Sequence, residues 1–214
     1  MAKATHQAMT TMLDLGDHEV LPQSPHYPVE LEHDLTAQDG STLHFRPIRP
    51  DDASGLVAFH DQLSRQSIYR RYFFMHTELS SSEVERFTCV DYVSRLAIVV
   101  IHDDHIVAVG RYNQTPGTSE AEVAFVVADK YQLHGIGTLL LDQLSEAAWG
   151  RGIDTFTALI LVENRVMLDV FHDSGFPIDT DLEDGTLLIR FSIRPCKESK
   201  RARSIRKIGR STPK

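Results

Sequence analysis

The segment from residue 122 to residue 138 holds the residues whose types and order point most directly to chemistry. It reads EVAFVVADKYQLHGIGT, an apolar β-branched run that ends in a loop with Gly135 and Gly137 and leads into an apolar helical pattern. Glycine lets a backbone turn tightly and approach a ligand, and the first amides of a helix are unpaired donors at the positive end of its dipole. The segment therefore predicts an anion site that suits a pyrophosphate.

Polar side chains in the same loop add to this prediction. Gln132 and His134 are expected to contribute side-chain donors, and Thr138 its hydroxyl. A glycine between a strand and a helix also occurs where it only makes the turn, so spacing alone leaves that alternative open. The lysine of a P-loop and the G-x-G-x-x-G pattern of dinucleotide sites are both missing here, which disfavours ATP hydrolysis and NAD binding.

The elements that must position this loop follow from the periodicity of the flanking sequence. Short β-branched runs predict strands, apolar residues at helical spacing predict helices, and Ser80 with Glu83 has the spacing of a capping box. The turn residues 103–105 indicate a hairpin. The chain is thus expected to be α/β, with a mixed, mostly antiparallel sheet flanked by helices. The expected strands are residues 43–48, 96–102, 106–113, 120–128, 155–162 and 186–193, and the expected helices begin near residues 50, 80, 138 and 164.

Composition places these elements in one domain. We expect an N-terminal extension over residues 1–36, a catalytic domain over 37–193 and a disordered basic tail over 194–214. The tail carries a net charge of +8 and the rest of the chain −16, so residues 197–214 are a candidate contact for a polyanion. Two cysteines and the lack of a long apolar run favour a cytoplasmic protein without membrane insertion.

Two motifs resemble the signatures of the GNAT superfamily of acyltransferases. QLHGIG (residues 132–137) matches the (Gln/Arg)-x-x-Gly-x-Gly/Ala loop with which GNAT enzymes hold the pyrophosphate of coenzyme A, and ENRVMLDVFHDSGF (residues 163–176) is similar to the second signature. The resemblance covers residues 40–193 and implies the GNAT fold, acetyl-CoA as acyl donor, and cofactor contacts from Ile136 and Asn164 as well as from the loop.

A narrower likeness is to the catalytic domain of bacterial Pat-type protein lysine acetyltransferases, carried by segments such as SIYRRYF and AEVAFVVADKYQLHGIGTLLL. It implies that Glu122 is the general base that deprotonates the acceptor amine. Glu120 should share its face of the strand and is the second candidate. Without the resemblance, a solvent-facing glutamate on an edge strand is the favoured interpretation of either residue.

The same likeness implies that the main chain of Phe125, Val126 and Val127 holds the pantetheine arm and polarises the thioester. It departs from many GNAT enzymes at Phe171, where those have a tyrosine that protonates the leaving thiolate. Water, His172 or Tyr112 are the alternatives for that proton.

The sequence as a whole predicts an N-acetyltransferase that acts on exposed protein lysines by direct attack. A GNAT enzyme for a small amine and a non-catalytic acyl-CoA sensor are the alternatives. No metal is expected, because His102 and His105 fall in a predicted turn.

Overall fold

The computed structural model describes residues 26–36 and 41–208, and side chains up to residue 204. It contains an eight-stranded sheet in the order β1-β2-β3-β4-β5-β6-β8-β7, in which β5 and β6 form the one parallel pair. The strands are β1 (His33–Thr36), β2 (Thr42–Pro47), β3 (Arg95–His102), β4 (His105–Gln114), β5 (Glu120–Val127), β6 (Thr155–Leu161), β7 (Ile178–Glu183) and β8 (Thr186–Ser192). The helices are α2 (Ala53–Asp61), α3 (Arg65–Tyr72), α4 (Ser81–Thr88), α5 (Ile136–Trp149), α6 (Arg165–Asp173) and α7 (Lys197–Ile208), with short 3₁₀ turns at Val29–Leu31, Pro50–Asp52 and Asp129–Tyr131.

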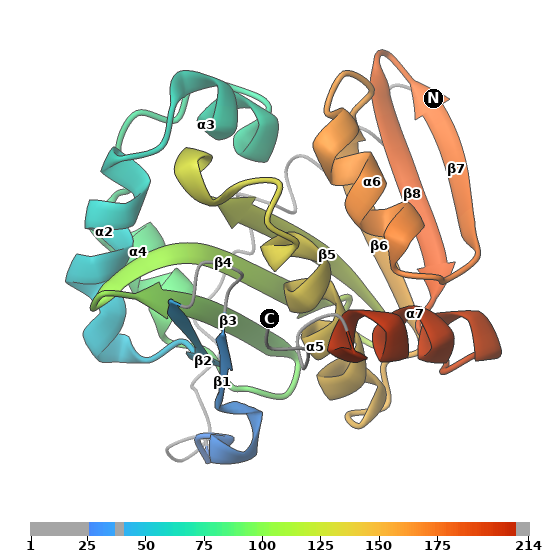
Figure 1. Ribbon diagram of the computed structural model, residues 1–214. Coiled ribbons are helices and arrows are strands. Elements are labelled where there is room, and N and C mark those ends of the chain that lie inside the picture. Colours follow the sequence, from blue (N-terminus) through green and yellow to red (C-terminus); the bar gives the residue numbers. More distant parts are fainter. Residues whose placement is uncertain (1–25, 37–40, 209–214) are drawn as a thin grey trace.

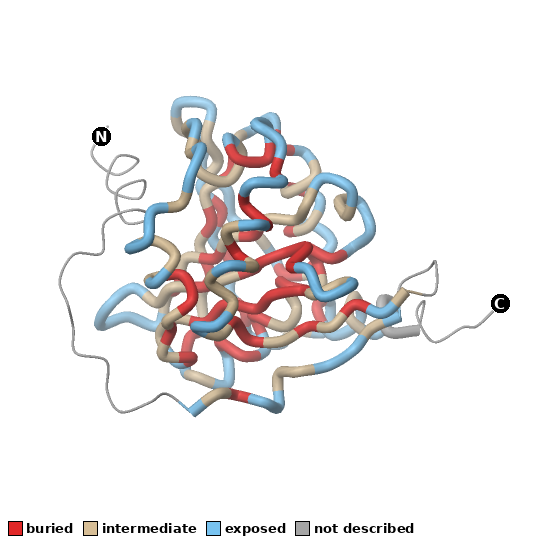
Figure 2. Tube along the Cα trace, turned by 90° about the vertical axis from the view of Figure 1, so that its left-hand side faces the viewer, coloured by how far each residue is buried: buried red, intermediate tan, exposed pale blue. Residues whose placement is uncertain are grey.

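Helices cover the two faces of the sheet unequally. On one face, α5 packs so closely on β4 that a side chain at Gly110 would collide with Phe125 and Leu140. On the other face, Phe59 of α2 and Phe87 of α4 lie over the neighbouring strands. Figure 1 shows α6 beside the β6–β8–β7 half of the sheet, on the same side as α5. The buried segments form a continuous interior between exposed outer surfaces (Figure 2).

Strand β5 is paired along much more of its length on one side than on the other. β5 pairs with β4 from residue 121 to residue 127, but with β6 only at the three residues 120–122, opposite Thr155, Phe156 and Thr157. Beyond those pairs the ladder between β5 and β6 ends, so the two strands diverge. The sheet is therefore open between β5 and β6 at the end where the glycine loop lies.

Most of the expected elements are confirmed, for reasons that are local. Ser80 caps α4, and the side chain of Glu83 returns the hydrogen bond to the Ser80 amide. Asp103 and Asp104 make the β3–β4 turn in left-handed conformations, with φ of 49° and 63°. Aspartate tolerates that region better than most residues, which is why the turn was readable from sequence.

Three elements were missed because their own patterns are weak. α3 is short and rich in arginine, and β1 and β7 are edge strands with mostly exposed side chains. β1 pairs with β2, so the domain begins before residue 37. The expected extension thus belongs in part to the sheet, and residues 1–25 lie outside the described residues.

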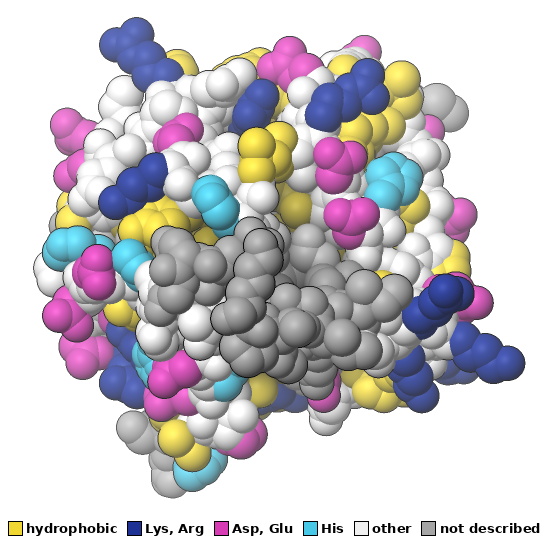
Figure 3. All heavy atoms as spheres, in the orientation of Figure 1, with side chains coloured by type: hydrophobic (Ala, Val, Ile, Leu, Met, Phe, Trp, Pro, Cys, Tyr) yellow, Lys and Arg dark blue, Asp and Glu magenta, His cyan; other side chains and the backbone are white. Residues whose placement is uncertain are grey.

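The disordered tail that we expected is wrong for Lys197–Ile208, which form α7. Arg203 donates a hydrogen bond of 3.2 Å to Asp142 of α5, and its guanidinium lies 5.8 Å from the centre of the Phe176 ring. Asp142 and Glu146 of α5 thus pair with a positive charge of the basic C-terminal segment. Figure 3 shows basic side chains gathered over α7. Contact with a polyanion through residues 197–214 stays a prediction, and residues 209–214 lie outside the described part of the chain.

A comparison of two glycine substitutions tests the packing of α7. Gly175 and Gly185 both have left-handed backbones, with φ of 76° and 77°. A Cβ at Gly175 would lie 2.8 Å from the carbonyl oxygen of Glu198, whereas a Cβ at Gly185 meets nothing within 4 Å. We expect Gly185→Ala to cost roughly 1–2 kcal/mol of unfolding free energy from backbone strain alone. Gly175→Ala should cost about 1–3 kcal/mol more because of the clash. Equal losses in urea titrations would contradict the packing of α7 on Gly175.

Candidate active site

The glycine loop presents an uncapped helix N-terminus, as the sequence predicted. Leu133 and Gly135 are both left-handed, with φ of 64° and 77°, and α5 begins directly after them. Gly135 has no side chain to cap the helix, and no side-chain cap is present in its place. The first amides of α5 therefore remain available to an anion, at the positive end of the helix dipole.

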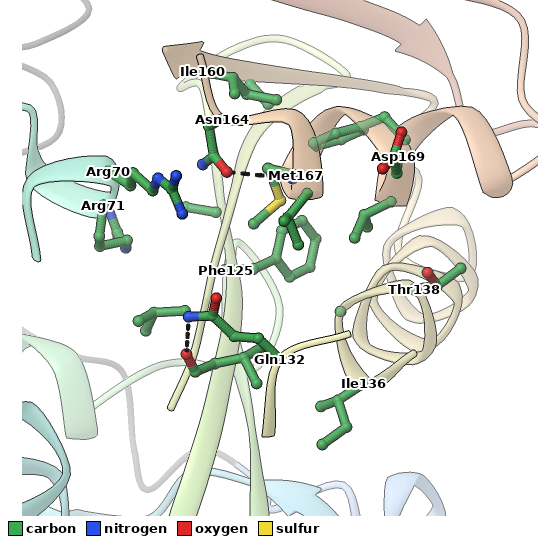
Figure 4. Close-up of a pocket in the computed structure, with 18 of the residues that line it drawn as sticks. Arg70, Arg71, Phe125, Gln132, Ile136, Thr138, Ile160, Asn164, Met167 and Asp169 are labelled. Carbon is green, nitrogen blue, oxygen red and sulfur yellow. Dashed lines mark hydrogen bonds between the residues drawn. The ribbon is translucent and has the colours of Figure 1, made fainter. Parts of the chain in front are cut away.

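A cavity of about 340 Å³ lies in the opening between β5 and β6. Its walls come from β5, the glycine loop, the start of α5, β6, α6 and α3 (Figure 4). Five of the expected cofactor residues in and after the loop line it, namely Gln132, Gly135, Ile136, Gly137 and Thr138. So do Phe125, Val126, Val127 and Asn164. The structure thus brings together residues from both motifs.

The edge of β5 that faces this cavity has no strand partner beyond Glu122, because the pairing with β6 ends there. The Val127 carbonyl is taken by the Gln132 side chain, which donates a hydrogen bond of 3.0 Å to it. The remaining main-chain groups of that edge can pair with an extended ligand in the way a further strand would.

Two expected side-chain donors have other placements. The Gln132 amide also donates to the Ser67 hydroxyl at 3.0 Å, so it ties the loop to α3 and is not a free donor. His134 is exposed and is not among the residues that line the cavity. Asn164 is buried and caps α6, where its side-chain oxygen accepts the Met167 amide at 3.3 Å. Asn164 therefore positions α6 at the cavity wall.

Glu122 lies at the vertex of the opening, as the last β5 residue paired with β6. Its side chain is not part of the cavity lining, but Val123 beside it is. Burial raises the pKa of the Glu122 carboxyl above its usual value of 4.5, and the Arg71 guanidinium partly opposes that shift. A carboxylate with a raised pKa is the stronger proton acceptor near neutral pH.

Glu120 shares the strand face but has the opposite electrostatics. Arg190 donates to it through both terminal nitrogens, one of them at 2.6 Å. This hydrogen bonding and charge hold the pKa of the Glu120 carboxyl below its usual range. Because Glu120 is already paired and remains ionised at lower pH, it is the poorer base of the two.

Helix α3 supplies site residues that the sequence analysis did not identify. Ser67, Arg70 and Arg71 line the cavity, and Figure 4 shows both arginines approaching it from α3. The Nε atom of Arg70 is buried with no hydrogen-bond partner among the described residues. The SIYRRYF segment carried the signal, but nothing in its spacing showed that it folds over the glycine loop.

Neither Tyr112 nor His172, the side chains considered for protonating the leaving thiolate, lines the cavity. Phe171 does line it, but this side chain has no proton to donate and packs against Phe125 and Phe191. Tyr112 is buried on the α5 face and donates its hydroxyl to the Val93 carbonyl at 2.9 Å. His172 is exposed and outside the lining.

In the described part of the chain, no three histidine, cysteine or acidic residues are arranged to hold a metal.

A strand pair that diverges beside an uncapped helix N-terminus and a half-buried carboxyl group suits an extended ligand that bears phosphate. The model of the Acetyltransferase (GNAT) family matches residues 64–176, more than half of the chain. The chain therefore belongs to the GNAT acetyltransferase family.

Three similar proteins agree with this assignment. The GNAT domain of PAT from S. lividans has 36% identity and a TM-score of 0.73, with 78% of this chain and 99% of that chain covered. An acetyltransferase from Pseudomonas aeruginosa is 27% identical over 155 residues, which is 71% of this chain and 83% of the relative. Acetyltransferase Pat from Mycolicibacterium smegmatis is 27% identical over 144 residues, 66% of this chain but 43% of the relative.

The opposite environments of Glu122 and Glu120 predict opposite effects on stability. A carboxyl with a raised pKa stabilises the fold at a pH below its unfolded pKa, and this contribution is lost as the pH rises through the folded pKa. Relative to wild type, Glu122→Gln should therefore gain unfolding free energy as the pH rises from below 4.5 to 8. Glu120→Gln should instead lose unfolding free energy relative to wild type as the pH rises through the acidic range. The reason is that the pKa of Glu120 is lowered, so the ionised carboxylate stabilises the wild type at higher pH. Chemical denaturation across pH measures both, and parallel curves would contradict the assignment.

A matched pair of glycines tests the anion site. Gly135 and Gly117 have φ of 77° and 74°, and a Cβ at either would meet nothing within 4 Å. Alanine at either position should cost a similar ~1–2 kcal/mol of stability. We expect only Gly135→Ala to weaken the binding of coenzyme A in calorimetry, roughly tenfold if about 1.4 kcal/mol of contact is lost. Equal affinities for the two variants would argue against the loop as the binding site.

Proposed function

We propose that the chain transfers an acetyl group from acetyl-CoA to the side-chain amines of protein lysines, with Glu122 as general base. The observation that carries the proposal is the opening between β5 and β6, which has unpaired helix amides at one end and the half-buried Glu122 carboxyl at its vertex. Such a site can hold a diphosphate at one end and a thioester beside a base at the other.

The fit of the donor rests on three groups of residues. The amides of Gly137 and Thr138 suit the pyrophosphate, and the unpaired edge of β5 suits the amide groups of the pantetheine arm. Arg70 adds a cation with a buried, unpartnered Nε at the cavity wall. A side chain at Gly137 would lie 3.1 Å from Val170, so glycine there also keeps α5 and α6 close.

The chemistry requires that the acceptor be a neutral amine. A lysine ammonium has a pKa of about 10.4 and no lone pair, so Glu122 must take its proton, directly or through water. The amine nitrogen then attacks the thioester carbonyl, a carbon–nitrogen bond forms, the carbon–sulfur bond breaks, and the nitrogen gives up its second proton to water. Since Phe171 has no proton to give and Tyr112 points elsewhere, the departing thiolate takes its proton from water.

The open face of the sheet supports a macromolecular acceptor. Leu188, Arg190 and Ser192 of β8 are exposed on the face that Glu122 shares, so helices leave that face accessible. Asp179 and Asp181 of β7 are exposed on the same face and suit a cationic segment. The motifs shared with Pat-type enzymes favour protein lysine over a small amine.

The proposal includes the cellular compartment in which the protein works. Both cysteines are unpaired, and within the described ranges no helix is long and apolar enough to cross a membrane. We infer from the free thiols that the protein works in the cytoplasm.

Acetyl transfer and its pH dependence test the proposal. The protein is incubated with acetyl-CoA, lysine-bearing proteins and polyamines, and acetylated products are identified by mass spectrometry. Acetyl groups on lysines support the proposal, acetyl groups on polyamines alone indicate a small-amine enzyme, and binding of acetyl-CoA without transfer indicates a sensor.

The two glutamates provide the matched variants for this assay. We expect Glu122→Gln to lower kcat by about 10²–10⁴-fold and to remove the acidic limb of the pH profile. Glu120→Gln should keep that limb, because Glu120 is paired with Arg190. An unchanged rate in Glu122→Gln would remove Glu122 from the mechanism.

A further inference from the structure

A half-buried arginine beside the cavity, Arg111, has no role in the site as described so far. Arg111 of β4 is in register with Ala124 of β5, two residues along from Glu122 and on the same sheet face. Its guanidinium lies 4.2 Å from the centre of the Phe87 ring. Adjacent strands are about 4.8 Å apart, so Arg111 lies within one strand spacing of the cavity wall.

The charges around Arg111 are of its own sign. Burial, together with the like charges of Arg71, Arg95 and Arg86, lowers the pKa of Arg111 to about 9. Among the described residues no carboxylate pairs with Arg111. Arg46, by contrast, has a carboxylate partner, because its guanidinium donates to both oxygens of Asp52 at 2.7 and 2.6 Å. A half-buried guanidinium that lies among like charges without an anion is unfavourable, which makes the surroundings of Arg111 a favourable place for one.

A second polar group lines the same place. His60 of α2 is 2% exposed, and neither ring nitrogen has a hydrogen-bond partner among the described residues, while Nδ1 lies 3.9 Å from Oδ1 of Asp61. His60, Arg71 and Arg111 all line a hollow of about 20 Å³, which is room for a group of about the size of a water molecule. Two kinds of donor thus converge on one small space.

This hollow borders the donor cavity. Arg71, Ala124 and Val126 line both. Ala124 follows Glu122 on the same face of β5, beyond the point where the pairing with β6 ends. A group attached to the reacting carbonyl, or to the acceptor amine, therefore needs only to turn toward α2 and α3 to reach the two arginines.

We infer that Arg111, Arg71 and His60 form a carboxylate subsite beside the transfer site. This inference rests on the proposed function. The carboxylate has two possible sources, the far end of a dicarboxylic acyl chain on coenzyme A and the carboxylate of an amino-acid-like acceptor. In either case it is a spectator, because the carbon–nitrogen bond forms and the carbon–sulfur bond breaks as before. The pyrophosphate is a separate ligand, held at the α5 end of the cavity.

The first arm of the test compares donors. Succinyl-CoA and butyryl-CoA have four-carbon acyl chains that differ in the terminal carboxylate, and the readout is the ratio of their kcat/KM values with one lysine peptide. If the acyl chain supplies the carboxylate, we expect wild type to favour succinyl-CoA and Arg111→Met to lower the ratio roughly 10- to 100-fold, as the loss of a charged hydrogen bond implies. Arg194→Met is the matched control, because Arg194 also lies over an aromatic ring, 5.7 Å from the centre of Trp149. It should leave the ratio unchanged.

The second arm compares acceptors with acetyl-CoA as donor. Lysine with a free carboxylate and lysine amide differ only in that group, and Arg111→Met should reduce the preference for the free carboxylate if the acceptor supplies it. A change in the first arm alone identifies the acyl chain as the source, and a change in the second alone identifies the acceptor.

The inference is overturned if wild type shows no preference for the carboxylate in either arm, a result that needs no variant to fold. It is also overturned if Arg111→Met lowers the unfolding temperature and leaves both ratios unchanged, since Arg111 then only supports the packing of α4. Calorimetry with coenzyme A separates this failure from that of the proposed function. Binding of coenzyme A and acetyl transfer without a carboxylate preference would contradict only the carboxylate subsite. A lack of coenzyme A binding would contradict the proposed acetyltransferase function itself.

Discussion

The early end of the β5–β6 ladder is the constraint on which the rest of the structure depends. Three residues of β5 pair with β6, while β4 continues to pair with β5 for the five residues beyond them, 123–127. A strand edge without a partner is normally a liability, because its amides and carbonyls need hydrogen bonds. Here the same edge borders a cavity of about 340 Å³, so the missing ladder becomes the place where an extended ligand can bind.

Two electrostatic features meet at this opening, and they act on different parts of the donor. The first turn of α5 concentrates unpaired amides at its positive end, which favours an anion. At the vertex, burial disfavours the charged form of Glu122 and so raises its pKa. The neighbouring Glu120 has the opposite shift because Arg190 pairs with it. Two identical side chains on one strand face thus acquire different proton affinities from their surroundings.

The arginines around β4 extend this electrostatic arrangement to the other side of β5. Arg111 and the arginines near it lie on the same face as Glu122, where Arg46 and Arg190 have acidic partners but Arg111 has none among the described residues. The face of the sheet that carries the base therefore changes from acidic near β7 to basic beneath α3. A donor or acceptor with charges of both signs would be oriented by that gradient.

The sequence by itself determined the glycine loop, the order of most strands and helices, and the family. These depend on local chemistry: left-handed φ at Gly135, the capping box at Ser80 and the alternation along β5 are all written within a few residues. Only the tertiary structure decided that Gln132 ties the loop to α3, that Arg71 and Arg111 share a hollow with His60, and that α7 is ordered against α5. Each of these is a contact between segments far apart in the chain, and periodicity carries no information about which charged side chains will meet.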